Sequence, residues 1–136
     1  MSNVLEDAKV NVKIRLSALW ITLMFSYSYA DVLGFYSPGN LADILAGEIG
    51  GVPLTQEMLF VMAVLMALPI VMMFLSLILM PKANRVLNIV AAIVYIVVLL
   101  ATFLTTITAY YVVLAGIELV CLVLIVWFAF KWPKQK

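Results

Sequence analysis

The chain has 136 residues and a net charge of +1, with 67% hydrophobic and only 11% charged residues. A soluble domain averages roughly 45–50% apolar and 25% charged residues, so this composition indicates a chain whose apolar surface faces lipid. The net charge by itself says nothing about nucleic acid, but the sequence has no basic cluster interleaved with aromatic residues, so we expect no nucleic-acid partner. The sequence has no histidine and one cysteine, Cys121, which excludes histidine-ligated haem or zinc and any disulfide within one chain. We therefore expect no cofactor and no metal site.

Four segments are long and apolar enough to span a membrane, which takes about 20 mostly apolar residues. They cover residues 14–36, 54–80, 86–106 and 110–130. Glu6 and Asp7 are among the first charged residues and argue against a cleavable signal peptide, so we expect the first span to act as an uncleaved anchor. Pro69 lies inside the second span and predicts a kink there, because proline removes one helix hydrogen bond.

The basic residues predict the orientation of these spans. All eight fall on one side of the membrane if the spans alternate in direction: Lys9, Lys13, Arg15, Lys82, Arg85, Lys131, Lys134 and Lys136. The positive-inside rule then places both termini in the cytoplasm. The expected fold is all-α, an integral membrane four-helix up-and-down bundle that forms a single multi-pass domain over residues 1–136.

The connections between the spans differ in length. The longer outer segment, residues 37–53, predicts a short amphipathic helix on the outer side, with Leu41, Ile44 and Leu45 at helical spacing. Asn40 is its candidate cap, and we expect the helix to lie across the outer mouth of the bundle. At the inner side, residues 81–85 predict a tight turn that makes the second and third spans antiparallel neighbours. Residues 4–12 allow a further helix that leads into the first span.

Glu118 is the strongest candidate for a functional residue, since an ionised side chain at mid-membrane costs on the order of 2.5–3.5 kcal/mol. It lies eight residues into the fourth span, about 12 Å from the outer end. Gly116 beside it would let another helix approach closely. The functional hypothesis is a ligand counter-ion or a proton-exchanging carboxyl. The structural alternative is a protonated or hydrogen-bonded glutamate that locks the bundle.

Asp31 ends a stripe of polar and aromatic side chains along the first span. The stripe follows helical steps of three or four residues and comprises Ser17, Trp20, Met24, Tyr27, Ser28 and Asp31. We expect it to point inward, because lipid offers no partner for Ser28 or Asp31. It predicts either the wall of a polar pocket with an aromatic floor or hydrogen bonding between helices near the interface.

Tyr95 lies in the middle of the third span, where a phenol requires a hydrogen-bond partner, and Glu118 is the candidate that we expect to provide it. The acids and hydroxyls are concentrated in the outer half, whereas the basic residues of the inner half lie at the interface only. This distribution predicts an outward-facing acidic pocket roofed by the 40–47 helix. Such a pocket would suit an amphiphile with a cationic or hydrogen-bonding head and an apolar tail.

Three hypotheses for the function follow. The first is a protein that binds or transports a small amphiphilic or cationic molecule, with membrane lipids as partners and a parallel homodimer as an open alternative. Its ligand-binding residues would be Asp31, Glu118, Tyr95, Trp20, Tyr27 and Ser28. The second is a structural or regulatory membrane subunit with no ligand of its own. An enzyme is disfavoured, because the one chemistry that these residues allow is carboxyl acid/base chemistry by Asp31 and Glu118.

Several motifs carry a resemblance to a known family. The run from Lys13 to Asp31 reads KIRLSALWITLMFSYSYAD, and later motifs are Gly50-Gly51 before Thr55-Gln56, Ala83-Asn84-Arg85, and Ile117-Glu118 with Cys121. They resemble a family of bacterial four-pass membrane proteins described only as a domain of unknown function. The resemblance covers nearly the whole chain and implies a bacterial inner-membrane location. The order of elements is also similar to that of DoxX-type four-helix membrane proteins, an analogy that transfers no site.

Overall fold

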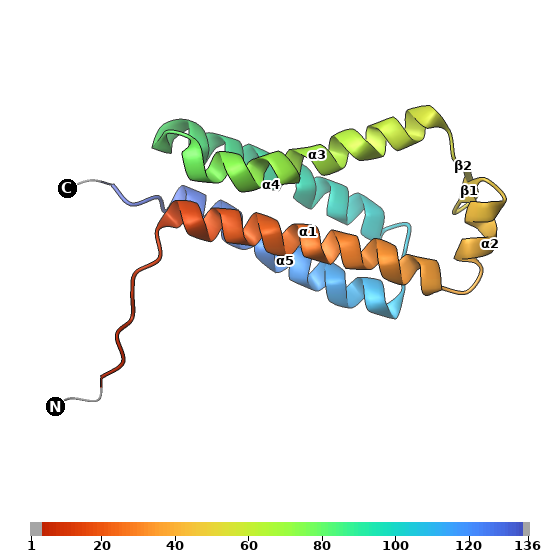
Figure 1. The fold of residues 1–136 in the computed structure, drawn as a ribbon, viewed down its shortest axis with the longest axis horizontal. Coiled ribbons are helices and arrows are strands. Elements are labelled where there is room, and N and C mark those ends of the chain that lie inside the picture. Colours follow the sequence, from red (N-terminus) through yellow and green to blue (C-terminus); the bar gives the residue numbers. More distant parts are fainter. Residues whose placement is uncertain (1–3, 135–136) are drawn as a thin grey trace.

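The computed structural model describes residues 4–134 and shows a bundle of four long antiparallel helices (Figure 1). The helices are α1 (Val12–Tyr36), α3 (Gln56–Ile78), α4 (Pro81–Phe103) and α5 (Ala109–Phe130). Each is long and apolar enough to cross a membrane. The expected four-helix up-and-down bundle is therefore confirmed. We call the end with both chain ends and the α3–α4 turn the basic end, and the opposite end, where α2 (Asn40–Leu45) lies, the acidic end.

Two helix starts differ from the sequence-based expectation. No helix forms over residues 4–11, because α1 begins only at Val12, where the Asn11 side chain accepts a hydrogen bond of 2.8 Å from the Lys13 amide. The exposed preceding segment has no packing surface to offset the cost of helix nucleation. The predicted turn over residues 81–85 is also wrong. Pro81 already lies in the first turn of α4. A proline is tolerated there because the amides of the first turn make no hydrogen bond within the helix. The turn between α3 and α4 therefore consists only of Leu79 and Met80.

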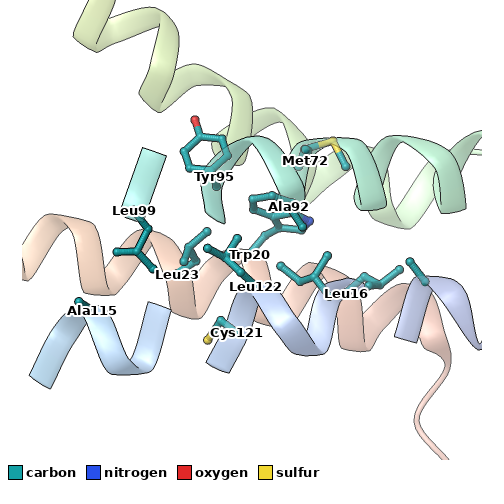
Figure 2. Packing of buried hydrophobic residues seen from close by; sticks show 13 residues of the cluster. Leu16, Trp20, Leu23, Met72, Ala92, Tyr95, Leu99, Ala115, Cys121 and Leu122 are labelled. Carbon is teal, nitrogen blue, oxygen red and sulfur yellow. The ribbon is translucent and has the colours of Figure 1, made fainter. Parts of the chain in front are cut away.

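The helices close into a bundle in sequence order. Helix α1 packs between α3 and α5, and α4 packs on α5, so the first and fourth spans are neighbours. The largest buried side chains gather between them, including Trp20, Tyr95 and Leu122 (Figure 2). Helix α3 contributes to this core only through its second half, with Pro69, Met72 and Ser76. Its first half diverges from α4 toward the acidic end (Figure 1).

The segment between α1 and α3 contains the predicted short helix α2 and a small hairpin. Gly39, with a φ of 90°, is the residue before α2, whereas Asn40 donates a side-chain hydrogen bond of 3.1 Å back to the Gly34 carbonyl, so the expected Asn40 cap is wrong. Strands β1 (Glu48–Ile49) and β2 (Val52–Pro53) follow. Gly50 and Gly51 form their two-residue turn with φ values of 57° and 78°, because this turn type requires positive φ at both positions. Close contacts of α2 within the described chain are with α1 and β1, so it lies over only part of the mouth.

Candidate functional site

Glu118 points from α5 into the bundle, and only 1% of its surface is exposed. The Ser26 hydroxyl on α1 lies 3.1 Å from Glu118 Oε1 and 3.3 Å from the Leu114 carbonyl, and it donates to these acceptors. The second carboxyl oxygen, Oε2, has no hydrogen-bond partner among residues 4–134. A buried polar atom without a partner loses its hydration without compensation. Glu118 is therefore only half satisfied by the protein itself.

A second buried polar atom without a partner lies close to Glu118. The Tyr27 hydroxyl is inaccessible to solvent and makes no hydrogen bond within the described part of the chain. Tyr27, Tyr111 and Asp31 are all near enough to Glu118 for their charges or dipoles to interact with it. The acidic half of the bundle thus contains a carboxyl and a phenol, each with one polar atom that has no hydrogen-bond partner among residues 4–134.

Ser28 and Asp31 are exposed, so the expectation that the whole stripe of α1 points inward is wrong for these two residues. Ser17, on the same face of α1, is buried and donates a hydrogen bond of 2.8 Å to the Met73 carbonyl of α3. That face is therefore covered only where α3 is close. The first half of α3 diverges and has no buried residue, so α3 does not cover Ser28 and Asp31.

Tyr95 bonds to a different partner from the one expected. Its hydroxyl donates to the Leu65 carbonyl on α3, not to Glu118. In an α-helix the carbonyl of residue 65 accepts from the amide of residue 69, but Pro69 has no amide hydrogen. Helix α3 continues through Pro69, and Tyr95 supplies the hydrogen bond that the proline removes. In Figure 2 the Tyr95 hydroxyl accordingly points away from Leu122 and toward α3.

The three aromatic residues of the predicted pocket do come together. The ring centres of Trp20 and Tyr95 lie 6.1 Å apart at an interplanar angle of 81°, an edge-to-face arrangement. The rings of Tyr27 and Tyr95 are also 6.1 Å apart. Tyr95 therefore links the core around Trp20 with the region around Glu118. Trp20 itself is fully buried at the boundary between the two halves of the bundle.

A buried amide network occupies the basic half of the bundle. The Trp20 indole nitrogen donates to Asn88 Oδ1 at 2.7 Å, and the Ser76 hydroxyl donates to the same oxygen at 3.2 Å. Asn88 Nδ2 donates to the side-chain oxygen of Asn84 at 2.7 Å, and Asn84 Nδ2 donates to the Ser76 carbonyl at 2.7 Å. All four side chains are fully buried. Uncharged polar side chains are thus buried in the basic half as well, in addition to the basic residues expected at its interface.

This network joins α1, α3 and α4. The indole N–H of Trp20 donates its hydrogen bond to Asn88 and is therefore not available to a ligand. Sequence reasoning missed it, although Asn84 and Asn88 are four residues apart and so share one helix face. It also missed Ser26, which continues the heptad-like series of buried residues Leu16, Trp20 and Leu23 on α1. In both cases the signal was a polar residue at a core position of the helix period.

Two shallow grooves flank α5 in the acidic half. One, of about 220 Å³, lies between α1 and α5 and is lined by Thr22, Phe25, Ser26, Tyr29, Leu114 and Ile117. The other, of about 280 Å³, lies between α4 and α5, where a Cβ added at Gly116 would meet no atom within 4 Å. Among residues 4–134, no neighbouring helix packs closely against Gly116, although α4 forms the other wall of this groove, so the close approach expected there is wrong. Ser26, which lines the first groove, donates its hydroxyl hydrogen bond to Glu118 behind it.

The fold and site together define a multi-pass membrane protein whose four-helix bundle encloses a partly unsatisfied carboxyl. The chain belongs to the Family of unknown function (DUF6326), whose model matches residues 4–136. This membership confirms the resemblance drawn from the motifs. No curated protein and no solved structure matches the chain significantly.

Proposed function

We propose that this protein binds a small amphiphilic molecule with a cationic or hydrogen-bonding head at Glu118, in an inner membrane with both termini cytoplasmic. The observation that carries the proposal is the second oxygen of Glu118, which is buried and has no hydrogen-bond partner among the described residues. A positively charged donor would satisfy this oxygen and offset the cost of an intramembrane carboxylate. Intramembrane acids are commonly ligand counter-ions or parts of ion pathways.

The surroundings of Glu118 suit both ends of such a ligand. The hydroxyl of Tyr27 offers a second polar contact for the head, since it also has no hydrogen-bond partner within the described part of the chain. The groove between α1 and α5, in which Ser26 lies, offers an apolar surface for the tail. Asp31 is exposed near the acidic end and would attract a cation electrostatically without holding it. We assign Trp20 and Tyr95 a supporting role, because their polar atoms are already hydrogen-bonded.

The proposal predicts that a lipophilic cation stabilises the wild-type protein but not Glu118→Gln. The glutamine can still accept the Ser26 hydrogen bond, so the variant loses the charge while it keeps the fold. At a ligand concentration of about 100 times Kd, binding should add about 2.7 kcal/mol to the stability of wild type. Thermal unfolding in detergent, with a panel of lipophilic cations and their neutral analogues, measures this difference.

Glu57→Gln is the matched control, because Glu57 is an exposed acid in the first turn of α3. Its response to the cations should equal that of wild type. If no compound shifts the melting temperature of either protein, or if Glu118→Gln responds as wild type does, the ligand site at Glu118 is refuted. A structural or regulatory subunit is then the better conclusion, and Glu118→Gln should be as stable as wild type across pH.

The amide network is the observation that favours this second function. A fully hydrogen-bonded core that joins three helices is sufficient to hold the bundle together without a ligand.

Transport, in contrast, would extend the binding proposal. A single four-helix bundle leaves little room for alternating access, so transport would require a second copy of the chain.

A further inference from the structure

Two arginines at the basic end lie over aromatic rings of α5. The Cζ atom of Arg15, on α1, lies 5.4 Å from the centre of the Phe128 ring. The Cζ atom of Arg85, on α4, lies 5.5 Å from the centre of the Phe130 ring. Contacts of this kind hold a guanidinium by cation–π attraction and leave its edge N–H groups free. The two arginines are therefore oriented by α5 but keep their donors available.

A third cation, Lys131, lies on the lipid-facing side of α5. Its Nζ atom is 3.8 Å from the centre of the Trp127 ring, which is 52% exposed. Since successive residues of an α-helix are about 100° apart, Phe128 and Phe130 lie on opposite flanks of α5 with Trp127 between them. The buried residue Ala129 marks the opposite, core-facing side. The three cations thus form an arc around the outer face of the end of α5.

No acid of the helical bundle lies near this arc. Five of the seven acidic residues belong to the acidic half: Asp31, Asp43, Glu48, Glu57 and Glu118. The other two, Glu6 and Asp7, precede α1 in the extended segment that leads away from the bundle (Figure 1). The positive charges of Arg15, Arg85 and Lys131, spread around the end of α5, therefore have no carboxylate of the helical bundle placed to neutralise them.

We propose that the cations of this arc, Arg15, Arg85 and Lys131, bind the phosphates of anionic phospholipids that surround the end of α5. Stacked guanidinium groups present paired donors that match phosphate oxygens. The exposed apolar side chains Val120 and Val123 continue along α5 from the arc and would contact the acyl chains. This apolar surface selects a lipid over free phosphate. The proposal concerns the opposite end of the bundle from Glu118 and is independent of the ligand proposed there.

The test compares two double variants that lose the same charge. Arg15→Gln/Arg85→Gln removes both stacked guanidinium groups, whereas Lys9→Gln/Lys134→Gln removes two positive charges from the segments outside the helices. Native mass spectrometry and thermal unfolding in detergent measure binding of phosphatidylglycerol, with phosphatidylcholine of the same chains and inorganic phosphate as comparison probes. At about 1 kcal/mol per basic residue, the arginine variant should bind phosphatidylglycerol about 25-fold more weakly than wild type. The lysine variant should bind nearly as wild type does.

Each alternative result contradicts the proposal in a distinct way. Equal weakening in the two double variants would show attraction to net charge and not a site at the arc. Equal stabilisation by phosphatidylcholine would show acyl-chain binding alone, and equal stabilisation by inorganic phosphate would show an anion site without a lipid. If the arginine double variant does not fold, the single variants Arg15→Gln and Arg85→Gln provide the same comparison, each with an expected loss of about fivefold.

Discussion

Replacement of Asn88 by alanine should lower the free energy of unfolding by about 3 kcal/mol, the largest effect that we expect from a single substitution. The change leaves the Trp20 indole nitrogen and the Ser76 hydroxyl without their acceptor, and Asn84 loses the donor to its side-chain oxygen. Hydrogen bonds between membrane helices are individually worth about 0.6 kcal/mol on average. The large total arises because one side chain makes several of these bonds and is fully buried. Unfolding by SDS titration in mixed micelles measures the difference.

Val90→Ala is the control for this substitution. Val90 lies on the same helix two residues away, and 54% of its surface is exposed. The substitution removes side-chain atoms from the outer face of α4 but breaks no hydrogen bond. Its effect on the free energy of unfolding should therefore be small. If Asn88→Ala costs no more than Val90→Ala, the amide network does not stabilise the bundle.

Tyr95→Phe should lower the free energy of unfolding by about 1–2 kcal/mol, because it leaves the Leu65 carbonyl of α3 without a donor. The structure also predicts that this cost depends on Pro69. In a Pro69→Ala background, residue 69 has an amide hydrogen that can donate to the same carbonyl. Tyr95→Phe should then be nearly neutral, so a double-mutant cycle should give a coupling energy of about 1 kcal/mol. SDS unfolding of the four proteins completes the cycle.

Tyr27→Phe is the matched control for Tyr95→Phe. It removes the same hydroxyl group from a tyrosine of the same aromatic cluster, but this hydroxyl has no hydrogen-bond partner among the described residues. Its removal should not lower the stability of the ligand-free protein and should raise it slightly, because a buried hydroxyl without a partner is itself unfavourable. An equal cost of Tyr95→Phe in the two backgrounds at position 69 would show that its hydroxyl does not replace the proline's missing amide.

The bundle divides into two halves with different polar chemistry. In the basic half, Asn84 and Asn88 connect buried groups that satisfy one another, and this arrangement favours rigidity. In the acidic half, Glu118 and Tyr27 each have a buried atom without a hydrogen-bond partner among residues 4–134, and α3 diverges from its neighbours. Stability and the proposed ligand site therefore lie in separate parts of the molecule. Substitutions at Asn88 and at Glu118 should accordingly affect different measurements.

The candidate site could be predicted from the sequence only in part. Glu118 was found because a carboxyl inside an apolar span must be buried or paired, whatever the arrangement of the helices. Tyr27 was predicted as a site residue because its helical spacing places it on the same face of the first span as Trp20. Ser28 and Asp31 obey the same spacing but are exposed. Periodicity identifies a face of a helix, but it cannot show how far the neighbouring helix covers that face.

The sequence by itself determined the four spans, the alternation of their directions and the separation of charge between the two ends. These features follow from hydropathy, length and the positions of Lys and Arg, which act locally along the chain. Only the tertiary structure decided the partners of the polar side chains. Tyr95 bonds to Leu65 and not to Glu118, and Trp20 bonds to Asn88. Such contacts join residues 30 and 68 positions apart, so they depend on the packing and relative height of whole helices.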